Sequence, residues 1–213
     1  MQTLIFANGN FDVFPEFPSL VETADLIIAA DGGAVHCASA GILPHVALGD
    51  FDSIGRELLE YYEREGVEIY RHPVHKNATD LELALDLAGE KGAQQVCLLG
   101  ALGGRWDMSM ANIMLAAQEK YRKIDVSLVG SGCRMHILHS GREHSVVNRH
   151  GIMVSLLPLG GDAEGVTLSG FRYPLTGHTI RFGSSRGVSN LMEAESASVY
   201  HRDGVLLCIQ HTE

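Results

Sequence analysis

The first 130 residues alternate between short apolar runs and longer segments whose apolar residues recur at helical spacing. Such alternation of strand and helix predicts a mostly parallel sheet with helices on its faces. The runs expected as strands are 3–7, 26–30, 46–48, 67–70, 96–99 and 126–129. The segments expected as helices are 54–65, 79–91 and 107–121. We therefore expect an α/β architecture for this part of the chain.

The pattern changes at about Arg134, where short alternating segments are separated by glycine-rich or polar turns. The segments expected as strands are 135–138, 143–147, 152–157, 179–182, 196–200 and 205–209. Long helical periodicity is absent from this part of the sequence, which favours a small antiparallel β-sandwich domain. With Gly130-Ser131-Gly132 as the connection, we expect an α/β domain over 1–131 and a β-sandwich domain over 132–213.

Composition limits the classes of function that the chain can have. A chain of 213 residues with 46% hydrophobic and 20% charged residues can bury a core without disulfides or structural metal. The formal net charge of -10 argues against general nucleic-acid binding, which needs clustered Lys and Arg, and favours small-molecule substrates. The cysteines are widely spaced, which favours reduced thiols. Without a signal-like N-terminus or a membrane-length apolar run, we expect a cytoplasmic protein that does not bind membranes.

Acidic residues follow several of the expected strands. In the segment Gly49-Asp50-Phe51-Asp52-Ser53, an extended backbone would place Asp50 and Asp52 on one side, and carboxylate oxygens suit a hard Mg²⁺ ion. The alternative is that Asp52 or Ser53 simply caps the next helix. Asp31 and Asp80 occupy comparable positions, and the carboxyl ends of parallel strands meet at one edge of a sheet. The sequence thus favours a metal and phosphate site there.

Two further segments have both a phosphate-binding and a structural interpretation. Gly103-Gly104-Arg105-Trp106-Asp107 is either a tight turn with Asp107 as helix N-cap, or a loop whose glycine amides and Arg105 fork meet phosphate oxygens. Lys76 is either an exposed loop lysine or a charge against a polyphosphate, and Thr79 with Glu82 forms a capping-box pattern.

The usual fingerprints of P-loop NTPases, dinucleotide-binding proteins, zinc proteases and serine hydrolases are absent.

The residues Cys133, His136 and His139 have a spacing that suggests zinc ligands. In a strand, however, a step of three residues sends His136 to the face opposite the other two. The strand prediction for this segment therefore argues against a zinc site.

Five motifs in this order resemble the thiamine pyrophosphokinase family: ADGGA (30–34), GDFDS (49–53), KNATD (76–80), GGRWD (103–107) and GVSN (187–190). The resemblance spans both halves of the chain. It implies an N-terminal α/β domain, a C-terminal β-sandwich and a homodimer. It also implies the Mg²⁺-dependent transfer of pyrophosphate from ATP to the hydroxyethyl group of thiamine, which gives thiamine diphosphate and AMP.

The resemblance also implies roles for individual residues. The implied catalytic residues are Asp50, Asp52, Asp80 and Arg105, and the first three are the implied metal ligands. The implied ATP-binding residues are Asp31, Gly32, Lys76, Thr79, Gly104, Arg105 and Asp107. The implied thiamine-binding residues are Tyr173, Ser189 and Asn190. Because thiamine sites in this family lie between subunits, the C-terminal residues of one subunit are expected to serve the nucleotide site of its partner.

Two residues depart from the family pattern. Asn77 stands where Asp is common, so it keeps an oxygen but loses a charge, and Met108 stands where His or Gln is usual and donates no hydrogen bond. These departures leave two alternatives open: a pyrophosphokinase for another heterocyclic alcohol such as a pterin, or a nucleotide- or thiamine-binding protein without catalysis. For an enzyme, either Asp52 or Asp80 could accept the proton of the attacking hydroxyl.

Overall fold

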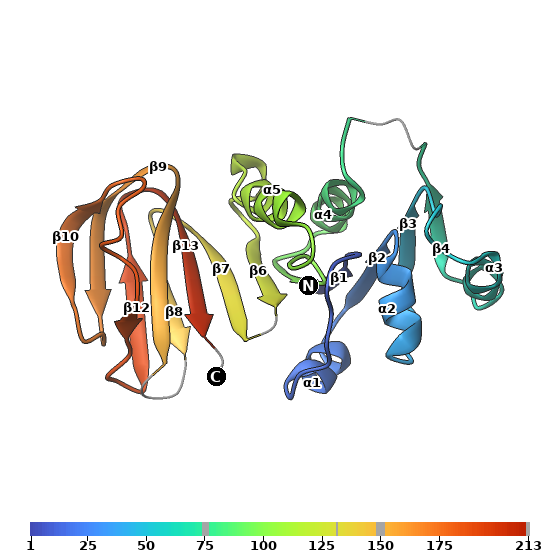
Figure 1. Cartoon of the computed structure of the whole chain (residues 1–213), viewed down its shortest axis with the longest axis horizontal. Helices are drawn as coiled ribbons and strands as arrows, with labels where there is room; N and C mark the ends of the chain where they lie inside the picture. Colours follow the sequence, from blue (N-terminus) through green and yellow to red (C-terminus); the bar gives the residue numbers. More distant parts are fainter. Residues whose placement is uncertain (74–76, 131, 148–151, 212–213) are drawn as a thin grey trace. The chain divides into compact units, whose positions relative to one another are not determined.

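The computed structural model describes residues 1–73, 77–130, 132–147 and 152–211, which belong to two compact units (Figure 1). Unit 1 comprises Met1–Leu115 and Lys123–Ser131. Unit 2 comprises Ala116–Arg122 and Gly132–Glu213. Each unit has its own hydrophobic core.

Unit 1 contains a parallel sheet. Its strands are β1 (Gln2–Phe6), β2 (Leu26–Ala30), β3 (Val46–Gly49), β4 (Glu68–Arg71), β5 (Gln95–Leu99) and β6 (Asp125–Gly130). They pair in the order β4-β3-β2-β1-β5-β6, with all pairs parallel. The chain moves outward from β1 to β4 and then returns to the other side of β1, so the order reverses between β1 and β5. Ligands of open α/β sheets bind beyond the carboxyl ends of the strands near such a reversal.

Helices cover the faces of this sheet (Figure 1). They are α1 (Phe17–Glu22), α2 (Gly33–Ser39), α3 (Arg56–Arg64), α4 (Asp80–Glu90) and α5 (Trp106–Ala116), followed in unit 2 by a short 3-10 helix η1 (Glu119–Tyr121). Alternate residues of β1 such as Leu4 and Phe6 join Phe17, Cys37 and Tyr62 of the first three helices in one core cluster. Helix α4 buries a separate apolar stripe that contains Leu81, Ala84, Leu85 and Ala88.

The starts of the helices differ from expectation in two places. Gly55 stands at the N-cap of α3 and supplies no side-chain bond, so the expected capping by Asp52 or Ser53 is wrong. Asp107 lies inside the first turn of α5, which begins one residue earlier, and is therefore not the N-cap. The capping role predicted for Thr79 is confirmed, because its side chain accepts a hydrogen bond from the Glu82 amide at 3.2 Å. Because Asp52 and Ser53 do not cap α3, their side chains can make other contacts.

Unit 2 is built from antiparallel strands that form two sheets. The strands are β7 (Cys133–His139), β8 (Glu143–Val147), β9 (Met153–Ser169), β10 (Leu175–Ile180), β11 (Asn190–Leu191), β12 (Ser196–Tyr200) and β13 (Asp203–His211). The first half of β9 pairs with β11 and β13, and its second half pairs with β10 and β12. Apolar residues from both sheets form one core. The predicted class, an α/β part followed by an antiparallel β-sandwich, is confirmed.

Strand β9 is longer than predicted. The sequence suggested a strand ending at residue 157, because Gly160, Gly161 and Gly165 look like turn residues. Gly160 and Gly165 do adopt positive φ angles of 75° and 66°, but the strand continues through them. Here the glycines allow one strand to pass from one sheet to the other. The next strand, β10, spans Leu175–Ile180, so it begins four residues before the expected range of 179–182 and overlaps only its first two residues.

Candidate functional site

Three aspartates come together at the carboxyl ends of two neighbouring strands. Asp31 follows β2, and Asp50 and Asp52 follow β3. One carboxylate oxygen from each of them lies within 4.8 Å of the others. Three hard oxygen donors at this separation suit a divalent cation such as Mg²⁺. We call Asp31, Asp50 and Asp52 the acidic group.

Asp31 is held in place by neutral donors. Its φ angle of 47° lies in the left-handed region, which Asp tolerates better than most residues. The Ser53 hydroxyl lies 2.9 and 3.0 Å from the two Asp31 carboxylate oxygens, and the Asn8 amide donates to one of them at 3.4 Å. A Cβ atom at Gly49 would lie 3.1 Å from the Asp31 Cα, and the φ of Gly49 is 147°. The glycine thus allows the two loops to approach each other.

The loop that carries the other two aspartates is anchored by Phe51. This side chain is buried in the core of unit 1, and the Arg71 guanidinium lies 5.7 Å from its ring centroid. Phe51 turns away and Asp50 and Asp52 belong to the acidic group, but the expected extended backbone is wrong: the φ of Phe51 is 61°, so the two aspartates converge through a left-handed turn. The Asp52 amide donates a hydrogen bond of 3.1 Å to Asp50 Oδ1, which fixes the shape of the turn.

The acidic group repels itself electrostatically. The pKa of Asp52 is raised, chiefly by the neighbouring charge of Asp50 and further by desolvation, Asp31 and Asp80. Asp80, a predicted metal ligand, is the first residue of α4 and lies outside the 4.8 Å group, although its charge acts on Asp52. Asp31, predicted as a nucleotide contact, lies inside the group. A bound cation would relieve the repulsion.

Arg105 and Asp107, both predicted for the nucleotide, are paired with each other. The Arg105 Nε and Nη2 atoms donate to the two Asp107 carboxylate oxygens at 3.2 and 2.5 Å. The hydrogen bonds raise the pKa of Arg105 and lower the pKa of Asp107. Gly104, next to them, has a φ of 59° that glycine adopts readily. Both side chains are exposed, so phosphate oxygens could replace Asp107 as the partner of the guanidinium.

Two buried polar residues of α5 hold the loop in front of Arg105. Ser109 Oγ accepts from the Gly103 amide at 3.0 Å and donates to the Arg105 carbonyl at 3.1 Å. Asn112 Nδ2 donates to the Ala101 carbonyl at 2.7 Å. Neither Ser109 nor Asn112 was predicted from the sequence, although a polar residue on the buried face of a helix is a sign of such a contact.

The remaining predicted nucleotide residues have different positions. Lys76 lies outside the described residues, so its role stays a prediction. Gly32 precedes α2, and a Cβ atom there would lie 2.1 Å from Asn8 Oδ1, so a larger residue would displace the Asn8 side chain. Thr79 caps α4 directly before Asp80. Met108, one of the two departures from the family pattern, lies in the first turns of α5.

Tyr173, Ser189 and Asn190, predicted to bind thiamine, lie in unit 2. The side chain of Asn190 is hydrogen-bonded to the backbone of Tyr173, so the structure brings these two together. Ser189 adopts a φ of 59°, and its amide donates to Ser155 Oγ at 3.0 Å. Ser155 was not predicted. Tyr173 is 63% exposed, whereas Asn190 is only 7% exposed.

Cys133, His136 and His139 all lie in β7. Because the strand is continuous through them, His136 points to the face opposite the other two.

The fold and the acidic group define the class of protein: an α/β unit with three clustered aspartates at its strand ends, followed by an antiparallel β unit. Two family models match in the same order. The model "Thiamin pyrophosphokinase, catalytic domain" matches residues 17–128, and "Thiamin pyrophosphokinase, vitamin B1 binding domain" matches residues 136–206. The chain therefore belongs to the thiamin pyrophosphokinase family.

Curated relatives and solved structures agree with this assignment. Thiamine pyrophosphokinase of Bacillus subtilis is 30% identical over 100% of both chains, and its crystal structure superposes with a TM-score of 0.87. The crystal structure of thiamin pyrophosphokinase from Geobacillus thermodenitrificans is 26% identical, with a TM-score of 0.84 over 100% of this chain and 98% of that one. Thiamine pyrophosphokinase 1 of Oryza sativa subsp. japonica is 30% identical over 87% of this chain and 79% of its own length. Among the described residues, no helix is long and apolar enough to cross a membrane.

Proposed function

We propose that this protein is an enzyme that transfers the β- and γ-phosphoryl groups of ATP together to the hydroxyethyl oxygen of thiamine, giving thiamine diphosphate and AMP. The observation that carries the proposal is the acidic group of Asp31, Asp50 and Asp52, in a chain whose unit 2 matches a vitamin B1 binding model. That match favours thiamine over a pterin as the acceptor alcohol.

The acidic group suits Mg²⁺ as the metal. Asp31, Asp50 and Asp52 offer carboxylate oxygens within 4.8 Å of one another, and their mutual repulsion favours a bound cation. Asp80, at the start of α4, is the proposed further ligand. When bound, Mg²⁺ would neutralise charge on the polyphosphate and help to orient it.

The residues near the glycine loop would bind the nucleotide. Gly104 leaves its backbone accessible, and Arg105 offers a planar fork that can bind two phosphate oxygens when it leaves Asp107. Lys76, Thr79 and Gly32 complete the proposed nucleotide side. In this arrangement Ser109 and Asn112 act as positioning residues, because they fix the loop on which Arg105 stands.

The chemical step is a displacement at the β-phosphorus. The hydroxyethyl oxygen of thiamine forms a bond to this phosphorus, while the bond to the oxygen bridging the α- and β-phosphates breaks and AMP leaves with the electron pair. The hydroxyl proton passes to Asp52 or Asp80. Alignment of the reactants and neutralisation of charge supply most of the catalysis in reactions of this type.

For thiamine, we propose Tyr173, Ser189 and Asn190 as the site. The exposed ring of Tyr173 offers an aromatic face to a substrate ring, and the positive thiazolium is favoured by the net negative charge of the protein. From the family resemblance we also propose a cytoplasmic homodimer. A single species of about 23.1 kDa in light scattering would argue against the dimer.

The assay that tests the proposal is the formation of AMP from ATP and Mg²⁺ with thiamine, with a pterin alcohol, or with no acceptor. We expect AMP only with thiamine. We expect Asp50→Asn to lower turnover on the order of a hundredfold or more, because it removes a charged ligand from the reacting centre.

The matched control is Glu22→Gln on α1, which also removes one negative charge and should leave turnover unchanged. Thermal melting checks that each variant is folded. Full turnover in the Asp50→Asn enzyme would refute the metal role of Asp50. Formation of AMP with the pterin alcohol and not with thiamine would show that a pterin is the substrate.

A further inference from the structure

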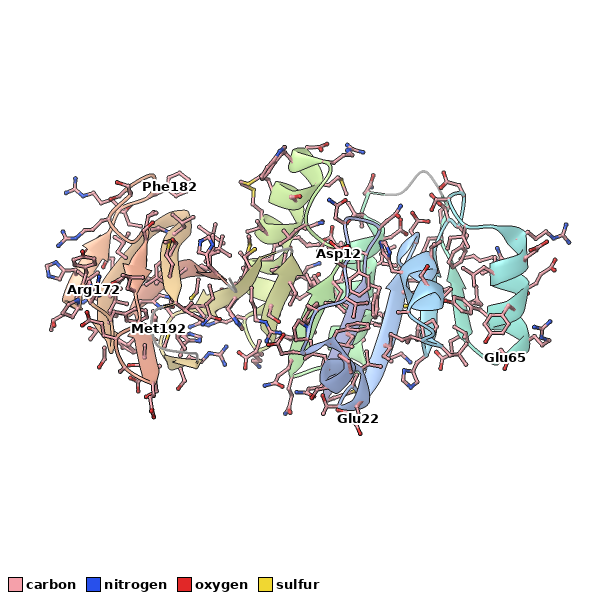
Figure 2. The ribbon with its side chains drawn as sticks, turned by 60° about the horizontal axis from the view of Figure 1, so that its bottom comes forward. Asp12, Glu22, Glu65, Arg172, Phe182 and Met192 are labelled. Atoms are coloured by element: carbon pink, nitrogen blue, oxygen red, sulfur yellow. The ribbon has the colours of Figure 1, made fainter. Side chains whose placement is uncertain are left out.

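A short ladder of hydrogen bonds leads to Tyr173. The segment from Gly170 to Tyr173 runs antiparallel to the segment from Asn190 to Glu193. The Glu193 amide donates to the Gly170 carbonyl at 3.0 Å, and the Arg172 amide donates to the Leu191 carbonyl at 2.8 Å. Figure 2 marks Arg172 and Met192, one on each side of this ladder. The backbone is therefore ordered up to the residue before Tyr173.

At Tyr173 the main-chain ladder is replaced by a side chain. Pro174 follows and has no N–H group to continue the pairing. The Asn190 Oδ1 atom accepts from the Tyr173 amide at 3.0 Å, and Asn190 Nδ2 donates to the Tyr173 carbonyl at 2.9 Å. The same Oδ1 also accepts from the Leu191 amide at 2.9 Å. The Asn190 amide thus holds both backbone groups of Tyr173.

Asn190 itself is fixed from the other side by β9. Asn190, in β11, pairs with Val154 of β9, and the amide of the preceding residue, Ser189, donates a hydrogen bond to Ser155 Oγ. Close packing reinforces the contact, since a Cβ atom at Gly187 would lie 2.2 Å from the Leu156 carbonyl oxygen. The turn cannot shift without breaking these bonds. It is therefore a rigid support for the segment that carries Tyr173.

Burial separates the roles of the residues in this turn. Tyr173 and Ser189 are exposed, whereas Asn190 is buried and its oxygen already accepts two hydrogen bonds. We infer that Asn190 is a positioning residue, which acts on thiamine through Tyr173, while Tyr173 and Ser189 face the substrate. This inference rests on the proposed function, because it assumes that thiamine binds at Tyr173.

A double-mutant cycle tests the inference. The dissociation constant of thiamine is measured by calorimetry with Mg²⁺ and α,β-methylene-ATP, which cannot release AMP. Asn190→Ala and Tyr173→Ala should each weaken thiamine binding on the order of tenfold, as expected for the loss or misplacement of one desolvated aromatic contact. The effects of two substitutions on the binding free energy do not add when one residue acts through the other. The double variant should therefore bind within about twofold of Tyr173→Ala alone.

Controls separate positioning from a loss of structure. Tyr173→Phe keeps the ring and should bind thiamine like the wild type, and the KM for ATP should stay unchanged in every variant. Asn190→Asp keeps the acceptor oxygen for the two amides but places its second oxygen, with a buried negative charge, against the Tyr173 carbonyl, so it should also weaken thiamine binding. If Asn190→Ala does not fold, the cycle is run with Asn190→Asp.

Each contrary outcome has its own meaning. Additive losses would show that Asn190 touches thiamine directly, and unchanged binding in Asn190→Ala would show that Tyr173 needs no support. Unchanged binding in Tyr173→Ala would show that its ring does not contact thiamine. Any of these results overturns the inference. A wild-type protein that binds thiamine but forms no AMP would overturn the proposed function alone, and one that binds no thiamine would overturn both.

Discussion

As far as the structure describes the chain, the hydrogen bonds that hold the acidic group come from neutral donors, which leave its negative charge unchanged. Asp31 receives bonds from Ser53 and Asn8, and Asp50 receives a bond from the amide of Asp52. A basic partner would cancel the charge that attracts a metal, whereas a hydroxyl or an amide fixes a carboxylate without changing its charge. At the level of single residues, these hydrogen bonds therefore fix the positions of the carboxylates and preserve the negative charge that would attract a cation.

The Ser53 hydroxyl should matter for metal affinity. In Ser53→Ala the Asp31 carboxylate loses the donor that lies near both of its oxygens. Loss of such a supporting contact typically weakens metal binding about tenfold or more. A titration with Mn²⁺ followed by electron paramagnetic resonance, with α,β-methylene-ATP present, measures this affinity. Ser53→Thr keeps the hydroxyl and serves as control, and equal Mn²⁺ affinity in Ser53→Ala would show that Asp31 needs no support.

The positions of the site residues could be predicted in part. Asp31, Asp50, Asp52 and Asp80 all follow predicted strands or begin a predicted helix, and sheet topology requires that such residues share one edge. The grouping of Asp31 rather than Asp80 with the other two depends on the left-handed turn after β2, which no local pattern indicates. The contact of Asn8 with Asp31 joins segments 23 residues apart, so only the folded chain reveals it, whereas Ser109 and Asn112 bond to the loop directly before α5.

Secondary structure elements were predictable where their apolar pattern was long. The parallel strands and α3, α4 and α5 have clear periodicity, but α1 and α2 are short, and α2 begins at a glycine that looks like a loop residue. Strand β9 was cut short because its glycines were interpreted as a turn. In each case tertiary packing, which a local pattern does not contain, determines the conformation.

Helix α4 begins with a cap that the sequence did predict, and its removal should be measurable. In Thr79→Ala the Glu82 amide loses its acceptor, and loss of such a cap costs about 1 kcal/mol. We expect the melting temperature to fall by roughly 2–4 °C. Thr79→Ser retains the hydroxyl and should melt like the wild type. A Thr79→Ala protein with unchanged stability would show that water replaces the cap at no cost.

On the scale of the whole molecule, the described residues of unit 2 include two buried histidines. His139 and His201 are 3% and 0% exposed, and His144 stacks on His201 with 6.1 Å between ring centroids. Burial, followed by the nearby His144, lowers the pKa of His201 to about 4. Burial also lowers the pKa of His139, while Glu119 opposes this shift and Arg122, Arg142 and His144 add to it. Both histidines are therefore neutral in the folded protein near neutral pH.

This burial predicts a dependence of stability on pH. The unfolded chain takes up a proton on His201 below its ordinary pKa of 6.5, whereas the folded chain does so only near pH 4. The free energy of unfolding should thus be unaffected by His201 above pH 6.5, fall between pH 6.5 and 4, and level off below. The loss is on the order of 3 kcal/mol.

Urea denaturation at a series of pH values measures this effect. In His201→Gln the side chain cannot be protonated, so the slope between pH 6.5 and 4 should be reduced relative to the wild type. The difference between the two proteins also removes the common contribution of carboxylates that titrate near pH 4. Identical slopes would show that His201 is protonated in the folded state as easily as in the unfolded chain.

Strand β9 links the sheets of unit 2, because its first half pairs with β11 and β13 and its second half with β10 and β12. The turn at Asn190 and the opposite sheet are thus attached to one continuous backbone. Amide protons in both layers should exchange with solvent in a single concerted opening, with no intermediate in which only one layer has melted. A destabilising change far from Tyr173 would then reduce the population of chains able to hold the vitamin, even where every contacting atom is intact.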